Sequence, residues 1–209
     1  ASSFISGEQA LRNLETEVGD ADFETVKARA QERWDEVLGR IEVSGKSVRV
    51  ALLLGGNQGD VKRTLQTAQQ LVNSRVGAVL RCSHRYESEP WGFPAAERFS
   101  NQALEVSTDL TPHEVLDACQ RIERELGRNR AAEAVEKASS GAVYCSRPID
   151  IDIIFYDDEV IGDERLTVPH PLLAEREFAL VPLCEIMCQR RHPVTGATVG
   201  EMLDALRNK

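Results

Sequence analysis

From residue 47 onward, runs with strand spacing alternate with runs that have helix spacing, and this order limits the fold more than any other feature. Strands are expected over 47–54, 76–88, 99–108 and 147–156. One helix is expected after Asp60, and Thr111-Pro112-His113-Glu114 has the pattern of a capping box that opens a second helix, reaching about Leu126. The predicted order is therefore β-α-β-β-α-β.

This order is typical of an α+β, ferredoxin-like core, in which four strands form one sheet and two helices lie on one of its faces. We expect the opposite face of the sheet to be free to carry chemistry. C-terminal additions follow the core. They comprise residues 168–186 and a short last helix, for which Thr198 and Glu201 form a second capping box.

Residues 1–46 differ from the rest of the chain. Apolar residues recur there at three and four positions, as in Val26, Ala30 and Trp34, and this spacing indicates an amphipathic helix. We therefore predict a helical N-terminal extension and linker over 1–46, and one main domain over 47–209. The run WDEVLGRIEV (34–43) resembles a linker of certain bacterial α-mannosidases. Because no sugar-cleaving module follows it, we interpret it as a relic of a fusion or gene boundary.

Composition excludes several classes of partner. The formal net charge of −9 argues against broad nucleic-acid binding, which needs a basic surface. No apolar run approaches the roughly 18 residues that cross a bilayer, and the first residues lack a signal-peptide pattern. The five cysteines contain no CxxC pair, which indicates reduced thiols in a cytoplasmic protein; they are Cys82, Cys119, Cys145, Cys184 and Cys188.

Asp150 and Asp152 are the main candidates for chemistry. Side chains two apart in a strand point the same way, so both carboxylates should share one face while Ile149, Ile151 and Ile153 enter the core. Asp is depleted from strands, and two like charges side by side repel. Mg²⁺ binds carboxylates together with substrate phosphates, so it is the natural partner for such a pair. A solvated polar face would give the same short pattern.

Three arginines flank this pair, and they strengthen the metal–phosphate interpretation. Arg128 and Arg130 follow a helix that ends near Gly127, and Arg147 precedes the acidic strand. Arginine forks match phosphate oxygens, and arginines beside a carboxylate–metal site are typical of phosphoryl transfer. His170 and Arg176 follow the strand, and His170 is a candidate donor to a phosphate. Any one of these side chains taken alone would also fit a structural role.

A glycine-rich turn, Gly55-Gly56-Asn57-Gln58-Gly59-Asp60, joins the first strand to the first helix. It lacks the lysine of a Walker-type loop and does not match G-x-G-x-x-G. A plain tight turn and a close approach of the backbone to a flat ligand both fit it.

Six blocks now agree in order: GGNQGD (55–60), YESEPWG (86–92), RFSNQALEVST (98–108), QRIERELGRNR (120–130), RPIDIDIIFY (147–156) and LTVPHPLLAEREFALVPLCEI (166–186). Together they resemble the 6-hydroxymethyl-7,8-dihydropterin pyrophosphokinase family of folate biosynthesis, over about 47–207. The resemblance implies a ferredoxin-like core. It also implies transfer of pyrophosphate from the co-substrate ATP to the pterin hydroxymethyl group, which gives the pterin diphosphate and AMP.

The resemblance also implies the roles of the site residues. Asp150 and Asp152 would ligate two Mg²⁺ ions, and Arg128 and Arg147 would complete the catalytic set. The ATP-binding residues would be Gln120, Glu123, Arg128, Arg130, Arg147, Ile149, His170 and Arg176. The pterin would lie against Gly55, Gly56, Ser88, Glu89, Trp91, Phe99, Asn101 and Phe178. Other folate-pathway enzymes would be functional neighbours.

The chain departs from the family pattern in two places. The first motif usually reads Gly-Ser-Asn, and here Gly56 replaces the serine, so a hydroxyl is lost. The loop over 131–146 looks longer than in compact members, and Tyr144 is the nearest aromatic residue before Arg147. Two alternatives stay open at this point: a degenerate ATP-binding module without turnover, and a palm-like nucleotidyl transferase, which would release pyrophosphate.

Overall fold

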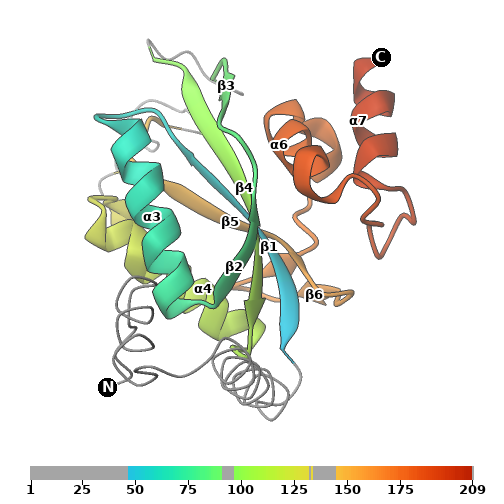
Figure 1. Ribbon diagram of the computed structural model, residues 1–209, viewed down its shortest axis with the longest axis horizontal. Coiled ribbons are helices and arrows are strands. Elements are labelled where there is room, and N and C mark those ends of the chain that lie inside the picture. Colours follow the sequence, from blue (N-terminus) through green and yellow to red (C-terminus); the bar gives the residue numbers. More distant parts are fainter. Residues whose placement is uncertain (1–46, 91–96, 132, 134–144, 209) are drawn as a thin grey trace, which may run out of the picture. The chain divides into compact units, whose positions relative to one another are not determined.

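The computed structural model describes residues 47–90, 97–131, 133 and 145–208 (Figure 1). The predicted extension over 1–46, Trp91 and most of the 131–146 loop, including Tyr144, lie outside the described residues. The division of the chain at residue 46 stays a prediction. Within the described part, no helix is both long and apolar enough to span a membrane.

One antiparallel sheet forms the centre of the described unit. Its strands are β1 (Val48–Gly56), β2 (Ala78–Cys82), β3 (Tyr86–Ser88), β4 (Phe99–Thr108) and β5 (Asp150–Tyr156). The order across the sheet is β2-β4-β1-β5, with β3 also paired to β4. The two long central strands, β1 and β4, therefore hold β5 on one side and β2 and β3 on the other. This arrangement confirms the predicted ferredoxin-like order.

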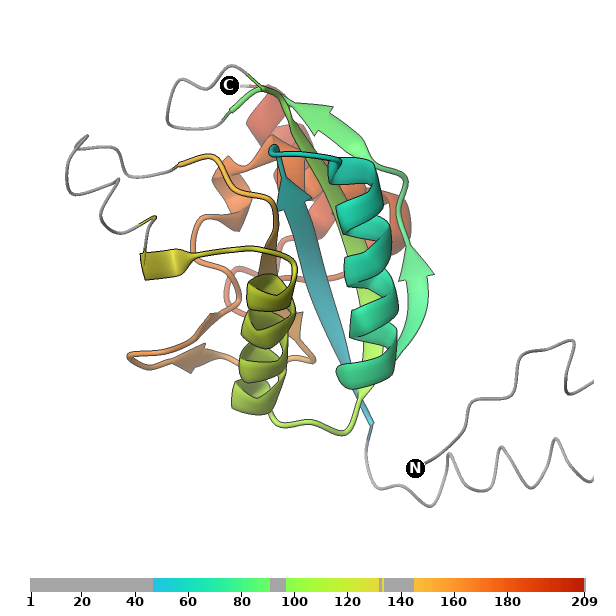
Figure 2. The same cartoon turned by 90° about the vertical axis from the view of Figure 1, so that its left-hand side faces the viewer.

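Two helices cover one face of this sheet, as predicted (Figure 2). Helix α3 (Val61–Arg75) begins after Asp60, whose carboxylate accepts the Arg63 N–H at 3.1 Å. Helix α4 (Pro112–Glu125) begins with the expected capping box, in which Glu114 accepts the Thr111 N–H at 2.8 Å. Their apolar faces meet the sheet in a first core, built from residues such as Leu52, Leu65, Leu104, Ile122 and Ile151.

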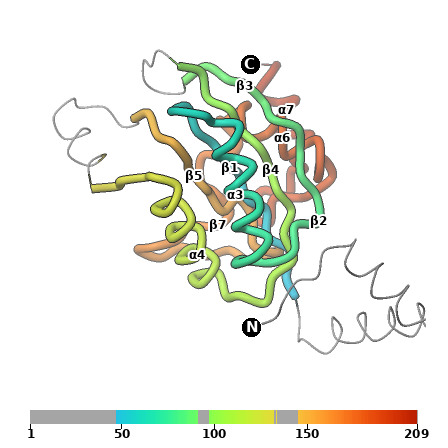
Figure 3. Tube along the Cα trace, turned by 60° about the vertical axis from the view of Figure 1, so that its left-hand side comes forward, coloured from blue at the N-terminus to red at the C-terminus, as the bar shows by residue number. Residues whose placement is uncertain are grey.

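The opposite face of the sheet is free only in part, so that expectation is wrong for the part on which two further helices pack. Helices α6 (Glu177–Met187) and α7 (Val199–Arg207) lie there, on the side away from α3 and α4 (Figure 3). They form a second core with Leu53 and Phe155 from the sheet, because those strand positions are apolar on this face as well. A short 3-10 turn, η1 (Leu173–Glu175), and a small hairpin of β6 (Ile161–Gly162) and β7 (Thr167–Val168) connect β5 to α6.

The prediction of one strand over 76–88 is also wrong, because β2 and β3 are separate strands. One extra residue lies between Cys82, which pairs with Leu104, and Tyr86, which pairs with Asn101. At this break the Ser83 hydroxyl accepts the Ala103 N–H at 2.9 Å. A side chain thus replaces a main-chain partner, and the strand bends.

The cysteines are only partly as expected. Cys184, in the last part of α6, forms a disulfide with Cys188, the residue that follows the helix, so the prediction of five reduced thiols is wrong for this pair. Cys82, Cys119 and Cys145 remain thiols. The cytoplasmic location that was inferred from the thiols stays a prediction.

Candidate functional site

A cavity opens over one end of the sheet, where β1, β3, β4 and β5 meet the segment that enters α6. Its lining contains most of the predicted site residues and combines acidic, basic, amide and aromatic side chains. The lining residues are Leu53, Gly55, Ser88, Glu89, Phe99, Asn101, Arg147, Asp150, Asp152, Arg176 and Phe178. Helices α6 and α7 cover the rest of this face, so the site is confined to the part of the sheet that they leave open.

The two aspartates lie on the same face of β5, as their spacing predicts. Asp150 stands opposite Gly55 and Asp152 opposite Leu53 in the ladder with β1. Ile151, between them, faces the first core and is buried. The strand thus presents two carboxylates to the cavity from the backbone of a central sheet, which is a rigid support.

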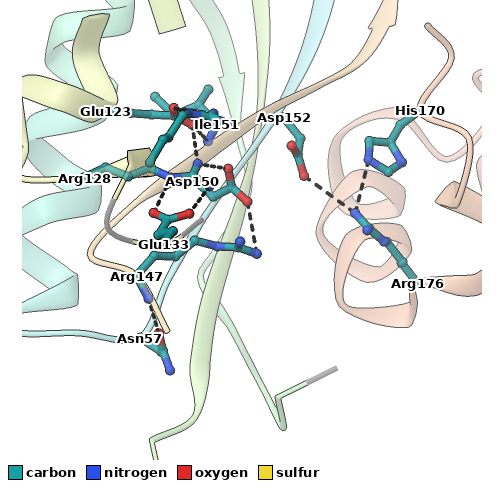
Figure 4. A network of polar contacts seen from close by, with 11 residues as sticks. Asn57, Glu123, Arg128, Glu133, Arg147, Asp150, Ile151, Asp152, His170 and Arg176 are labelled. Atoms are coloured by element: carbon teal, nitrogen blue, oxygen red, sulfur yellow. Dashed lines mark hydrogen bonds and ion pairs between the residues drawn. The ribbon is translucent and has the colours of Figure 1, made fainter. Parts of the chain in front are cut away.

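Positive charge surrounds Asp150. Arg147 Nη2 lies 3.1 Å from one of its oxygens, and Arg128 Nη1 donates to the other (Figure 4). Burial alone would raise the pKa of this carboxyl, but the charges of Arg147 and Arg128 lower it below its ordinary value. Asp150 is therefore ionised at neutral pH.

Asp152 has the opposite balance. Its nearest cation is Arg176, with Nη1 at 3.6 Å from Oδ2, and its side chain is 32% exposed to the cavity. Desolvation, followed by the negative charge of Asp150, raises the pKa of Asp152 to about 7. The two carboxyls of the pair therefore differ in pKa, although they lie on the same face of one strand.

Arg128 and Glu123 form a buried layer beside Asp150 (Figure 4). The Glu123 side chain is only 1% exposed, and its carboxylate accepts from Arg128 at 2.8 Å, from Arg130 at 2.6 Å and from the Ile151 N–H at 2.8 Å. Burial alone would lower the pKa of Arg128, but the carboxylates of Glu133, Asp150 and Glu123 raise it. Glu123 therefore supports the arginines from behind, and in this structure it does not line the cavity.

Arg176 connects the cavity to His170. Its guanidinium lies 3.2 Å from the His170 Nε2 and 5.6 Å from the centre of the Phe178 ring. Burial, and next the charge of Arg176, lower the pKa of His170 to about 4, so the ring is neutral at neutral pH. A direct contact of His170 with phosphate stays a prediction.

Aromatic and amide groups also line the cavity. Asn101 is buried, and its Nδ2 donates to the Ser88 hydroxyl at 3.0 Å. A Cβ atom at Gly55 would lie 2.8 Å from the Asn101 Oδ1, so glycine makes room for this amide. The Phe99 ring lies 5.8 Å from the Arg147 guanidinium. Phe99 and Phe178 thus place two aromatic rings beside the charged groups.

The remaining predicted residues lie at the edge of the site or outside the described part. Gly56 packs its backbone against Pro148, and Ile149 points its side chain into the first core. Neither residue lines the cavity. Gln120 is half-buried on α4, and Arg130 is half exposed. Nothing in the structure describes Trp91.

Sequence reasoning did not single out two residues that position the arginines. Asn57 is buried, its Oδ1 accepts the Arg147 N–H at 2.9 Å, and its Nδ2 donates to the Ser146 hydroxyl at 2.9 Å. The position of Asn57 in the glycine-rich turn was the sequence feature that could have marked it as a site residue. Glu133 binds Arg128 through both carboxylate oxygens, at 2.9 and 3.1 Å. No local pattern marks Glu133.

A family model described as 7,8-dihydro-6-hydroxymethylpterin-pyrophosphokinase matches residues 51–188. A second model, the glycosyl hydrolase family 92 catalytic domain, matches residues 9–53. That second match covers about a fifth of the chain, mostly outside the described residues, and does not show membership of that family.

Curated relatives agree with the first match. The 2-amino-4-hydroxy-6-hydroxymethyldihydropteridine pyrophosphokinase of Porphyromonas gingivalis is 38% identical over 138 residues, which are 66% of this chain and 89% of the relative. The Bacillus subtilis protein of the same name is 37% identical, over 72% of this chain and 84% of the relative. The folic acid synthesis protein fol1 of Schizosaccharomyces pombe is 37% identical over 78% of this chain, which spans only 21% of that longer protein.

Solved structures give the same fold. The wild-type HPPK-DHPS of Plasmodium falciparum with pteroate has a TM-score of 0.61 and 16% identity. The match covers 77% of this chain but only 44% of the longer chain. At this identity the likeness concerns the fold alone.

Proposed function

The chain belongs to the 7,8-dihydro-6-hydroxymethylpterin-pyrophosphokinase family, and from this we propose that its reaction takes place in the cavity over β5. As a member of this family it transfers pyrophosphate from ATP to 6-hydroxymethyl-7,8-dihydropterin in folate biosynthesis. The observation that supports the location is that one cavity is lined by two aspartates, two arginines, a buried amide and two phenylalanine rings: Asp150, Asp152, Arg147, Arg176, Asn101, Phe99 and Phe178.

Mg²⁺ fits the two aspartates as part of this proposal. Hard divalent cations prefer oxygen ligands, and a cation beside the pair would offset the repulsion from Asp150 that, after desolvation, raises the pKa of Asp152. Within the described part of the chain, no group of three or more His, Cys, Asp or Glu residues forms a complete metal site. Phosphate oxygens and water would therefore complete the coordination. When bound, Mg²⁺ would neutralise phosphate charge and lower the pKa of the attacking hydroxyl.

The residues of this chain would act on both substrates. Asn101 would bind the pterin edge, and Phe99 and Phe178 would lie against its ring, which places the hydroxymethyl group towards Asp150 and Asp152. The hydroxyl oxygen would attack the β-phosphorus of ATP, and AMP would leave in line. Arg147 and Arg176 would stabilise the charge on the transferred group, since both reach the cavity with fixed guanidinium groups.

Other folate-pathway enzymes are proposed as functional neighbours. The folate synthesis bifunctional protein of Pisum sativum, whose matching part is 34% identical to 70% of this chain, supports this proposal. This chain spans only 27% of that protein.

The test incubates the full chain with ATP, 6-hydroxymethyl-7,8-dihydropterin and Mg²⁺. Chromatography of the reaction mixture measures the AMP that is formed. EDTA should abolish AMP formation, and added Mg²⁺ should restore it. Asp152→Asn should lower the rate by about 10²–10³-fold, because it removes an anionic ligand from a preorganised site. Asp204→Asn, at an exposed position on α7, is the matched control and should retain the wild-type rate.

Three outcomes would contradict the proposal. Near-normal AMP formation by a folded Asp152→Asn variant would remove the aspartate pair from the reaction. Release of pyrophosphate in place of AMP would indicate a nucleotidyl transferase. Binding of ATP without any turnover would indicate a degenerate nucleotide-binding module.

A further inference from the structure

Arg128 is fully engaged by carboxylates in this structure. Its Nη1 donates to Glu123 and Asp150, while its Nε and Nη2 donate to the two oxygens of Glu133 at 2.9 and 3.1 Å (Figure 4). The Nε–Nη2 edge is the part of a guanidinium that matches two phosphate oxygens. An internal carboxylate thus occupies the edge that a triphosphate would use.

Glu133 is the partner that can leave at the lowest cost. Asp150 also binds Arg147, and Glu123 also binds Arg130 and the Ile151 N–H, so both are fixed by other groups. Among the described residues, the Glu133 carboxylate contacts Arg128 alone. The Glu133 N–H donates to the Asn129 carbonyl at 3.0 Å. Glu133 can therefore exchange without breaking the layer beneath β5.

We propose that Glu133 is a positioning residue that competes with the phosphates of ATP for Arg128. It keeps the guanidinium ordered beside Asp150 while ATP is absent, and it gives up the Nε–Nη2 edge when the triphosphate arrives. The cost of this exchange lowers the affinity for ATP and leaves the pterin affinity unchanged. This inference rests on the proposed function and on the role in binding ATP that the family resemblance implies for Arg128.

The test compares Glu133→Gln with the wild type. Gln has nearly the same shape but no charge, so the competitor is weakened while the packing is kept. Calorimetric titration with α,β-methylene-ATP and Mg²⁺, which cannot release AMP, should show about tenfold tighter binding, as expected for the loss of a charge-assisted pair. The KM for ATP should fall in parallel, and the KM for the pterin should stay the same. Unchanged or weaker binding of the analogue would overturn the inference.

Two further variants separate this inference from the proposed function. Glu125→Gln removes the same charge from an exposed pair with Arg75, away from the cavity, and should leave the binding of the analogue unchanged. Arg128→Lys keeps the positive charge but loses the Nε–Nη2 edge that donates two parallel hydrogen bonds, so it should weaken the binding of the analogue. In the Arg128→Lys background, Glu133→Gln should no longer tighten binding. A gain that persists there would mean a general charge effect and would overturn the competition.

If Arg128→Lys alone leaves the binding of the analogue unchanged, the proposed role of Arg128 fails, and the inference fails with it. If Arg128→Lys weakens binding while Glu133→Gln does not tighten it, only the inference fails. The two failures are therefore distinguishable from the same titrations.

Discussion

At the residue scale, Asn57 shows how a turn between two elements fixes a side chain of the site. Besides the side-chain hydrogen bonds of Asn57 with Ser146 and Arg147, its backbone N–H donates to the Arg147 carbonyl at 3.0 Å. The end of β1 thus holds the segment before β5 at three points. This segment carries Arg147 to Asp150 and Phe99, so the turn acts on the site without contacting a substrate.

Asn57→Ala should therefore impair both stability and activity. It leaves the Arg147 N–H without its partner, which should cost about 1–3 kcal/mol of unfolding free energy, measured in urea. AMP formation should fall by about tenfold to 10²-fold, because Arg147 is no longer held in place. Asn73→Ala removes a comparable bond, to the Val79 N–H on the other side of the sheet, and should leave the rate unchanged. An Asn57→Ala variant with normal kcat would refute this role.

Gly56 is fixed by contact with the same segment. A Cβ atom at this position would lie 2.4 Å from the Pro148 carbonyl oxygen, a main-chain atom that cannot turn aside. Glycine stands here in place of the usual serine, and the backbone of Pro148 approaches that of Gly56 closely. The space that a serine side chain would need is therefore filled by main-chain atoms.

Gly56→Ala should lower the unfolding free energy by about 1–3 kcal/mol through overpacking, and should lower AMP formation by displacing the segment before Asp150. Gly162→Ala is the control, because no atom lies within 4 Å of its added Cβ. Equal urea midpoints for the two variants would contradict the prediction.

At the element scale, the two capping boxes make helix stability depend on pH. The Glu114 carboxylate accepts from the Thr111 hydroxyl and N–H, and these bonds lower its pKa below the ordinary 4.5. A carboxyl with a lowered pKa in the folded state stabilises above its unfolded pKa and loses this effect as the pH falls through its folded pKa. The contribution of Glu114 is therefore present at neutral pH and lost in acid.

Glu114→Gln should accordingly be less stable than the wild type at pH 7, and the difference should disappear as the pH falls below about 4.5 and the wild-type carboxyl is protonated. Urea unfolding at several pH values measures this difference. Glu164→Gln, at an exposed loop position, should follow the wild type throughout. A Glu114→Gln difference that stays constant down to the acid range would exclude a charged cap.

At the scale of the whole described unit, the sheet lies between two cores, and the second one holds part of the site. Arg176 and Phe178 sit at the start of α6, which is packed on the sheet through Leu180 and Leu183. The position of these two site residues thus depends on the apolar contacts that hold α6 on the sheet.

Leu183→Ala should lower the unfolding free energy by about 2–5 kcal/mol, because it removes a fully buried side chain and leaves a cavity. Its KM for both substrates should rise, since α6 carries Arg176 and Phe178. Val160→Ala, at a position that is 62% exposed, should change the unfolding free energy by no more than about 0.5 kcal/mol. Similar effects of the two substitutions would show that the second core does not hold α6.

Local rules made much of the fold predictable. The two-residue period of a strand predicted that Asp150 and Asp152 share one face. The capping residues predicted where α3, α4 and α7 begin. Each of these features depends on residues within one turn or one strand, so the sequence carries it directly. The family motifs supplied the names of the cavity-lining residues, and most of them do meet in one cavity.

Only the tertiary structure decided which distant segments meet. Three features have no local signature in the sequence. They are the packing of α6 and α7 on the second face, the break between β2 and β3, and the hydrogen bonds between Glu133 and Arg128. The sequence by itself determined the order of the elements and the direction of the side chains along each one, because both follow from backbone periodicity. The contacts that hold the arginines depend on how the loops close in space, and the identity of the residues alone does not specify that closure.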